Sequence, residues 1–239
     1  MISILSAAGA VACLVIAALL LRRVGRGYRI ARLLASAPLA SIAEVLQVAA
    51  DGERRYMRLS GRVTSDEEFP DENQRPLVFR RQRIERRAGA NWQVLDEDRL
   101  AVPFGVEDRR DFVAVDADAL GEGLVVIPRE STGVARELPD ELRSRLPSDL
   151  EAETPIRLRV DQVSAVEQAT VVGMPITGAA GPIMTAGLGR PLILSTLDES
   201  AAMRLLAGDG RQSVLMAAAA LIAGLALLAI TVVAVLAGW

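Results

Sequence analysis

The sequence predicts a membrane-anchored β-rich (α+β) protein in which two transmembrane helices flank a compact β barrel or sandwich. Three observations support this fold class. Each end of the chain carries a long apolar run without charge. All of the 27 basic and 30 acidic residues lie between those runs. The middle consists of short alternating segments at intervals of about 10 to 20 residues, a pattern typical of strands.

The first apolar run is predicted as a transmembrane helix over residues 1–21. Residues 2–21 carry no charge. At 1.5 Å per residue they reach about 30 Å, the thickness of the hydrocarbon core. No basic residue precedes the run, and Arg22 and Arg23 stand where a signal peptidase would need small residues. We therefore expect a retained anchor and not a cleaved signal peptide.

A basic juxtamembrane helix is predicted over residues 22–37, because apolar and basic residues interleave until Pro38 ends the helix. Two interpretations stay open. The helix either continues the anchor into the cytoplasm, or it lies in the membrane interface, where its arginines would touch anionic headgroups. The candidate membrane-surface residues are Arg22, Arg23, Arg26, Arg29 and Arg32.

A second transmembrane helix is predicted over residues 213–237. Residues 214–236 are free of charge, and Trp239 is a residue typical of the boundary between lipid and water. Both runs carry small residues at helical spacing, which lets two helices pack closely, either with each other or in a homo-oligomer. These residues are Gly9, Cys13 and Ala17 in the first run, and Ala217, Ala220 and Gly224 in the second.

The flanking charges predict the orientation. Arginines crowd the inner end of the first run, Arg204 and Arg211 precede the second, and the outer ends carry no basic side chain. Under the positive-inside rule the central domain lies in the cytoplasm and both termini lie outside, with the cell (inner or plasma) membrane between them. Two spans agree with this, since they return the chain to the side where it began.

Residues 38–212 are predicted as one soluble β-rich domain. Residues 155–163 show the strand pattern most clearly, because apolar and charged residues alternate there. Residues 42–48 could be a short helix or a strand. Residues 66–75 are acidic and predict an exposed loop, residues 139–146 predict a short helix, and Asp198 is expected to cap a last helix. The other predicted strands are residues 54–64, 77–87, a strand beginning at 92, 112–115, 124–127, 170–176 and 192–194.

The composition excludes several kinds of chemistry. The net charge is −3, which argues against a dedicated nucleic-acid binder. The chain has no His and no Lys, and its one cysteine, Cys13, lies in an apolar run. Serine–histidine triads, Schiff-base lysines and zinc sites of His and Cys are therefore excluded. Chemistry by Asp, Glu, Ser, Thr, Tyr and Arg remains possible, and no cofactor or metal is expected.

Five glycines cluster late in the domain. A phosphate-binding loop would need a helix start directly after it, whereas Arg190, Pro191 and an apolar strand follow here. A flexible, turn-rich loop is the preferred interpretation. The five residues are Gly173, Gly178, Gly181, Gly187 and Gly189.

Two charged clusters are candidate sites. A group of carboxylates lacks the spacing of a hydrolase or calcium site and predicts a solvated turn. A basic strand could face anionic lipid, but pairing with acids on its neighbours is the preferred interpretation, with Glu67, Glu68, Asp71 and Glu72 available. The carboxylates are Glu107, Asp108, Asp111 and Asp116, and the basic strand carries Arg80, Arg81, Arg83, Arg86 and Arg87.

Short motifs follow one another between the apolar runs, from Gly61-Arg62-Val63 to Pro191-Leu192-Ile193-Leu194-Ser195-Thr196. In this order and between two spans, they resemble the GIDE-type ("beside a membrane") domain of the mitochondrial ubiquitin ligase activator of NF-kB family and its prokaryotic relatives. The resemblance covers nearly the whole chain. The family-motif positions are Gly61, Pro76, Trp92, Pro103, Phe104, Glu107, Asp108, Pro191, Ser195 and Thr196.

The resemblance implies a tethered β-rich domain, with two departures. Leu77 replaces a small or Cys residue, and residues 109–111 replace a glycine turn. Eukaryotic ligase members add a zinc-binding RING after the second span, and the lack of suitable Cys and His here means that ligase activity is not expected. In the mitochondrial members the domain lies between the two membranes, opposite to the side that the arginines predict here.

The main hypothesis is a non-enzymatic, membrane-tethered interaction or scaffold domain of prokaryotic origin. It would present a β-rich surface to an unknown protein partner or to the lipid bilayer. The alternatives are a membrane-bound, carboxylate-dependent hydrolase and an accessory subunit of a transport or protein-quality complex. An enzyme predicts carboxylates that converge in a pocket, and a binding module predicts a flat or grooved surface.

Overall fold

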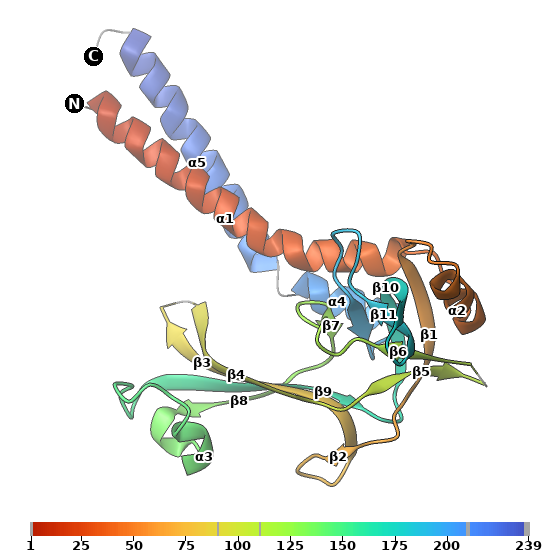
Figure 1. Cartoon of the computed structure of the whole chain (residues 1–239). Coiled ribbons are helices and arrows are strands. Elements are labelled where there is room, and N and C mark those ends of the chain that lie inside the picture. Colours follow the sequence, from red (N-terminus) through yellow and green to blue (C-terminus); the bar gives the residue numbers. More distant parts are fainter. Residues whose placement is uncertain (1, 90, 110, 209–210, 237–239) are drawn as a thin grey trace. The chain divides into compact units, whose positions relative to one another are not determined.

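The computed structural model describes residues 2–89, 91–109, 111–208 and 211–236 (Figure 1). The chain divides into two compact units. A helical unit contains Met1–Ser36 and Glu199–Trp239, and a β-rich unit contains Ala37–Asp198. The fold is that of a β-rich α+β protein with mixed sheets, as predicted.

Three helices form the helical unit: α1 (Ile2–Ser36), α4 (Glu199–Gly208) and α5 (Arg211–Leu236). α1 contacts both of the others, and Figure 1 shows α1 and α5 side by side. The predicted juxtamembrane helix is therefore continuous with the first apolar run. It ends two residues before Pro38, because a residue directly before proline is disfavoured in the helical conformation.

Small residues lie where α1 and α5 meet. A Cβ added to Gly9 would come within 3.3 Å of Leu227, and one added to Gly224 would come within 3.2 Å of Leu14 and 3.3 Å of Cys13. These contacts show that the two helices run antiparallel. Of the two arrangements left open for the small residues, packing of the two helices on each other is the one seen in this structure. The other buried small residues of these helices are Ala10, Ala17 and Ala217.

One helix among the described residues is long and apolar enough to cross a membrane, and it is the segment Leu215–Val233 of α5. In α1 the corresponding apolar segment is shorter, Gly9–Leu19. The predicted first span, residues 1–21, also includes residues 1–8 and 20–21, whose side chains lie outside the described part of the chain. Length and composition thus support one of the two predicted spans.

Five strands of the β-rich unit close into a barrel: β1 (Met57–Thr64), β5 (Phe104–Asp108), β6 (Asp111–Val115), β10 (Gln168–Gly178) and β11 (Gly181–Thr185). Their order is β1-β5-β6-β11-β10, and β10 pairs with β1 to close the ring. β6 and β11 are parallel, and the other four pairs are antiparallel. This is the strand order of an OB-type Greek-key barrel, a fold that by itself assigns no function.

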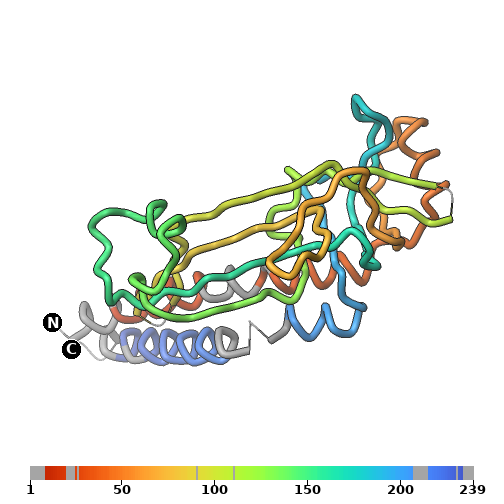
Figure 2. The backbone as a smooth tube through the Cα atoms, turned by 90° about the horizontal axis from the view of Figure 1, so that it is seen from below, coloured from red at the N-terminus to blue at the C-terminus, as the bar shows by residue number. Residues whose placement is uncertain are grey.

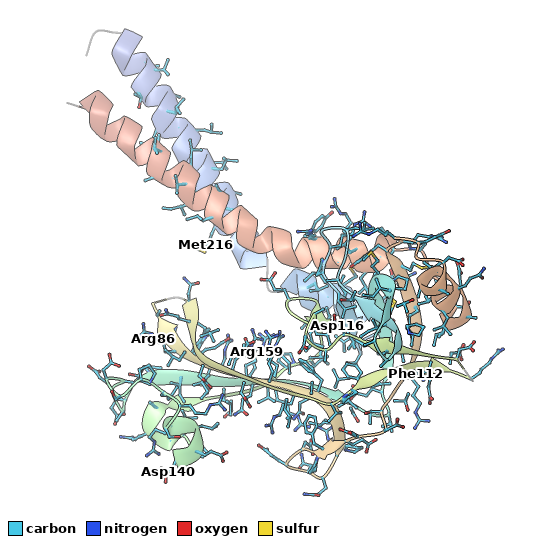
Figure 3. The ribbon with its side chains drawn as sticks, viewed as in Figure 1. Arg86, Phe112, Asp116, Asp140, Arg159 and Met216 are labelled. Atoms are coloured by element: carbon cyan, nitrogen blue, oxygen red, sulfur yellow. The ribbon has the colours of Figure 1, made fainter. Side chains whose placement is uncertain are left out.

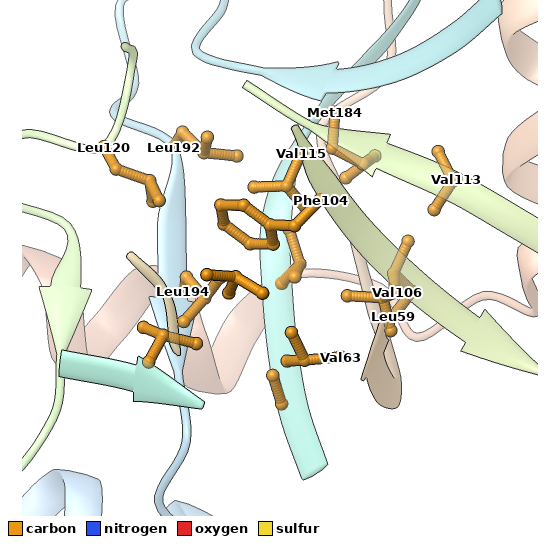
Figure 4. Packing of buried hydrophobic residues seen from close by; sticks show 14 of the residues in the cluster. Leu59, Val63, Phe104, Val106, Val113, Val115, Leu120, Met184, Leu192 and Leu194 are labelled. Atoms are coloured by element: carbon orange, nitrogen blue, oxygen red, sulfur yellow. The ribbon is translucent and has the colours of Figure 1, made fainter. Parts of the chain in front are cut away.

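Aliphatic side chains around Phe104 fill the barrel (Figure 4). In β1, buried residues alternate with more exposed ones, as a strand with one face toward a core requires. Leu59, Val106 and Leu194 are completely buried. Two short strands, β12 (Ile193–Ser195) and β7 (Leu124–Val125), continue the sheet beyond β10.

Residues 42–48, for which helix and strand were both open, belong to helix α2 (Ile42–Ala50). The Oγ of Ser41 caps it by accepting the backbone N–H of Glu44 at 3.2 Å. Val45 and Val48, three residues apart on one helical face, are buried in the barrel core. The helix contacts β6, β10 and β11.

A second sheet contains β2 (Phe69–Pro70), β3 (Pro76–Ala88), β4 (Asn91–Ala101), β8 (Arg129–Val134) and β9 (Pro155–Ser164). β9 lies between β3 and β8, and both β2 and β4 pair with β3. All of these pairs are antiparallel, and Figure 2 shows the long strands running side by side.

One face of the second sheet is covered by the segment between β8 and β9. It contains the short helices η1 (Ala135–Glu137) and α3 (Asp140–Arg143). Leu138 of this segment packs in a small core with Ile84 and Ile156 of the sheet. The opposite face carries charged side chains.

Candidate functional site

The charged face of the second sheet brings together side chains from four strands. They stand at alternate positions of β3 and β9, so they point to the same side. Figure 3 shows Arg159 on this side of the sheet and Asp140 of α3 on the other. We call this surface the arginine face. Its directly opposed pairs on β3 and β9 are Arg81 with Asp161, Arg83 with Arg159, and Glu85 with Arg157. They are adjoined by Trp92, Glu97 and Arg99 of β4 and by Glu130 of β8.

Asp161 is the centre of the arginine face. The Nε and Nη2 of Arg81 donate to its Oδ2 at 3.0 and 2.8 Å, and the Nη2 of Arg83 donates to the same oxygen at 2.9 Å. The Nε of Arg159 lies 3.4 Å from Oδ1. Because Asp161 is only 2% exposed, its charge is stable there only through these guanidinium groups. Arg81 also donates to the carbonyl of Gly121 at 2.7 Å, which fixes the loop before β7.

A second charged group lies beside the first. It contains Glu85, two residues after Arg83 on β3, and Arg157, two residues before Arg159 on β9. Arg157 donates to Glu85 through Nε at 2.7 Å and also through Nη2. Glu130 joins the two groups, because it lies 3.5 Å from Arg157 and 3.3 Å from Arg159. The Arg157 guanidinium also stands 4.8 Å from the ring centroid of Trp92, within the range of a cation–π contact.

The guanidinium donors of this face exceed its carboxylate acceptors. Five arginines, including Arg99 of β4, share the carboxylates of Glu85, Glu97, Glu130 and Asp161. Among the described residues, the buried Nε of Arg83 has no hydrogen-bond partner. Arg83 and Arg159 keep 20% and 24% of their side chains exposed. An arrangement of this kind is suited to an anionic group, since guanidinium binds carboxylate and phosphate oxygens in a planar, bidentate way.

The predicted basic strand is β3, and its pleat divides the arginines between two faces. Arg81 and Arg83 lie in the arginine face, whereas Arg80 lies on the opposite side, 4.0 Å from Asp98 of β4. The prediction that these arginines pair with acids of neighbouring strands is confirmed for Arg80, Arg81 and Arg83. Arg86 bonds instead to the amide oxygen of Gln93, and Arg87 bonds to the carbonyl of Gly89. The expected acids, residues 67–72, were wrong for Arg81 and Arg83, because β9 and not the acidic loop lies beside that part of β3 and supplies Asp161.

Asp71 organises the acidic loop. Its Oδ1 accepts backbone N–H bonds from Asn73 at 2.7 Å and Arg75 at 2.9 Å, and its Oδ2 accepts from the Nε of Arg75 and lies 3.5 Å from Arg129. The backbone N–H of Arg75 contributes most to holding the pKa of Asp71 below its ordinary value of 3.8, while burial opposes this shift. The predicted exposed loop therefore has an ordered core of its own.

The apolar side of α1 after its first half is buried in the protein. An interfacial helix would need that side free to enter the lipid. The structure therefore favours a plain extension of the anchor over a helix lying in the membrane plane. The buried residues are Ile30, Leu33 and Leu34. Of the predicted membrane-surface residues, Arg29 and Arg32 are exposed, and the side chains of Arg22, Arg23 and Arg26 lie outside the described residues.

The family-motif positions are spread over both sheets and form no common site in the described structure. Gly61 lies where β1 meets β5, and a Cβ there would come 2.5 Å from a carbonyl oxygen of β5. The carbonyls of Pro103 and Pro191 accept hydroxyl bonds from Ser65 at 2.6 Å and Tyr56 at 2.5 Å. Pro76 begins β3, Trp92 lies in β4, Phe104, Glu107 and Asp108 lie in β5, Ser195 ends β12, and Thr196 follows it.

The glycine cluster forms turns, as predicted, with one exception. Gly178 and Gly181 flank the turn between β10 and β11, and Gly189 adopts a φ of 67° in the next turn. Gly173 instead lies inside β10, where a Cβ would come 2.7 Å from Leu192.

The carboxylate cluster is divided between two places. Glu107, Asp108 and Asp111 lie on the β5–β6 hairpin, whereas Asp116 accepts the hydroxyl of Thr185 at 2.6 Å. Within the described ranges, no group of three or more His, Cys, Asp or Glu residues could hold a metal ion.

Comparison with known proteins adds no relative to this geometry. No protein-family model, no curated protein and no solved structure matches the chain. The resemblance to the GIDE-type domain therefore stays a prediction.

Sequence reasoning missed the acids and arginines of β9 as members of a site. A signal was present in the spacing, because Arg81-x-Arg83-x-Glu85 and Arg157-x-Arg159-x-Asp161 are both Arg-x-Arg-x-acid. Antiparallel pairing of these two segments sets the acid of each against an arginine of the other, as the observed register shows. The sequence alone does not say that these two segments are neighbours.

Proposed function

We propose that this chain is a membrane-anchored, non-enzymatic interaction protein. In this proposal α1 and α5 cross the cell membrane as an antiparallel helix pair, the β-rich unit lies in the cytoplasm, and the arginine face receives a protein partner. The observation that carries the proposal is the distribution of small and large side chains on the two helices.

Many large apolar side chains of the helix pair face away from the helix–helix contact. Ile222 is 68% exposed and Leu215 is 64% exposed on α5, and Val11 is 60% exposed on α1. In water this surface would be unfavourable by roughly 25 cal/mol per Å². A soluble helix pair would place its large residues in the contact and polar residues outside. In lipid the observed arrangement is the favourable one, because close packing between helices there depends on small residues.

The register of the pair of helices α1 and α5 supports the proposed orientation. Gly9 lies against Leu227, and Gly224 lies against Leu14. This antiparallel register places the helix positions of Arg26 and Arg211 at the same end of the apolar segments. Arginines gathered at one end are expected on the cytoplasmic side, where they can also meet anionic headgroups. The layout of a tethered domain between two spans is also what the GIDE-type resemblance implies, without ligase activity.

Alkaline carbonate extraction of membranes from expressing cells tests the anchor. We expect the full chain to stay in the membrane pellet, while a peripheral protein followed in the same preparation is released. Recovery of the chain in the supernatant would contradict the proposal, because a helix pair that spans the bilayer is not removed by alkali.

A further inference from the structure

The proposed function does not say what chemistry the partner has, and the arginine face favours a partner with negative charge. We infer that this face binds an extended acidic segment of a partner protein, whose carboxylates at alternate residues reach Arg83 and Arg159. The inference rests on the proposed function for its cellular setting, but its evidence is separate, since all of it comes from the β-rich unit.

The first step is the state of the hydrogen-bonding groups. Oδ2 of Asp161 already accepts from two arginines, Glu85 is engaged by Arg157, and Glu97, opposite Arg83 on β4, accepts from the Nε of Arg99. Arg83, by contrast, uses only one of its three guanidinium nitrogens in hydrogen bonds with the described residues. The carboxylates are occupied and guanidinium donors remain, so the missing group is an acceptor with negative charge.

The second step is the spacing of the arginines. Arg83 and Arg159 are directly opposite on adjacent strands, which lie about 4.8 Å apart. Arg157 and Arg159 stand two residues apart on β9, so their Cα atoms are separated by about 6.8 Å. An extended peptide repeats its side chains at the same interval on one face. A Glu-x-Glu sequence therefore repeats its carboxylates at the interval of Arg157 and Arg159, and its flexible side chains also span the shorter distance between Arg83 and Arg159.

The third step distinguishes a polypeptide from a membrane surface. The guanidinium groups of Arg83 and Arg159 are recessed, with about three-quarters or more of each side chain covered. A flat bilayer first meets side chains that protrude, whereas a narrow peptide can reach recessed ones. The stack of Arg157 on Trp92 at the same face agrees with this, because Arg and Trp are the residues most enriched at the centres of protein interfaces.

Binding of a defined peptide to the full chain tests the inference. The chain is placed in nanodiscs of zwitterionic lipid, and a fluorescent peptide of alternating Glu and Ser is titrated by anisotropy, with a peptide of alternating Gln and Ser as the control. We expect salt-dependent binding of the Glu peptide alone. The double variant R83Q/R159Q should weaken it at least about tenfold, since two charge-assisted contacts are lost.

Two further variants separate loss of binding from loss of folding. Arg87→Gln removes a charge next to the arginine face. Among the described residues its side chain bonds to the carbonyl of Gly89 in its own loop, and we expect about threefold weaker binding through the reduced local field. Arg62→Gln removes an exposed charge of the barrel and should leave binding unchanged.

Equal affinity of wild type, R83Q/R159Q and R87Q for the Glu peptide would overturn the inference. So would binding to added phosphatidylserine vesicles that R83Q/R159Q abolishes while the peptide does not bind. Failure of the chain to insert into nanodiscs counts against the membrane anchor alone, because peptide binding can still be titrated on the soluble protein.

Discussion

Arg81 donates two hydrogen bonds to a single oxygen of Asp161, although the two residues are 80 positions apart in the sequence. Both side chains are buried. The contact joins β3, which lies in the long connection between β1 and β5, to β9, which lies in the connection between β6 and β10. The second sheet is thus built from two separate insertions into the barrel, and this ion pair stabilises their association.

Asp161→Asn is expected to destabilise the protein strongly. The substitution leaves the buried guanidinium of Arg81 without its counter-charge, and removing one partner of a buried pair costs about 3–5 kcal/mol. Urea unfolding of the full chain in detergent measures the change. Asp140→Asn is the matched control, because Asp140 is 96% exposed in its ion pair with Arg143 and should change stability by less than about 1 kcal/mol. Equal effects of the two substitutions would refute a stabilising role of the network.

Gly61→Ala tests the close approach of β1 and β5. The added methyl group would meet a carbonyl oxygen at 2.5 Å and the side chain of Val106 at 2.6 Å, so the strands must separate. Overpacking of this kind costs about 1–3 kcal/mol. Gly121→Ala serves as the control, since nothing lies within 4 Å of a Cβ at that position. Thermal melts of the two variants should differ, and a Gly61→Ala melt that matches wild type would show that the contact yields without cost.

Gly224→Leu is expected to loosen the contact between α1 and α5 near Cys13, the only cysteine of the chain. A Cβ added at position 224 would lie 3.3 Å from the Cβ of Cys13, so a larger side chain must push α5 away from α1. The rate of Cys13 modification by N-ethylmaleimide in detergent micelles should rise. Ala223→Leu places the same side chain at an exposed neighbouring position and should leave the rate as in wild type.

Asp71 gives the stability a defined dependence on acid. Its pKa in the folded protein is lowered, first through the backbone N–H of Arg75, so the contribution of Asp71 is present above the unfolded pKa of about 4 and is lost as the pH falls through the lower folded value. Unfolding measured from neutral pH down to acid should therefore show a smaller acid-dependent loss for Asp71→Asn than for wild type. Parallel curves for the two proteins would rule out Asp71 as a contributor.

Sequence patterns predicted most of the strands with a clear apolar period and missed β5, β8 and β11. Strands β3 and β9 alternate polar and apolar residues and were predicted nearly to their ends. β8 was missed because it is an edge strand whose residues are exposed or partly exposed, so Arg129–Val134 has no apolar period. β11 was missed because Gly181 and Pro182 read as a turn, while pairing with β10 and β6 overrides that local signal.

The candidate site shows the same limit. The arginines of β3 were recognised from the sequence, but their partner was sought in the acidic loop nearest in the chain. The register between β3 and β9 includes a shift between Leu77 and Phe79, which leaves no local trace in the sequence. The small-residue faces of the helices could be predicted, because helical spacing alone brings Gly9, Cys13 and Ala17 to one side.

The proposed membrane anchor formed by α1 and α5 is tested most directly by the reactivity of cysteines placed on the outer surface of these helices. In a Cys13→Ala background, Ile222→Cys and Tyr28→Cys each introduce one thiol at positions that are 68% and 72% exposed in the protein. In lipid vesicles, a membrane-impermeant maleimide should label Tyr28→Cys when applied from the cytoplasmic side and should leave Ile222→Cys unlabelled until detergent or denaturant is added. Labelling of both cysteines at the same rate in intact vesicles would show that α5 lies in water and would contradict the account.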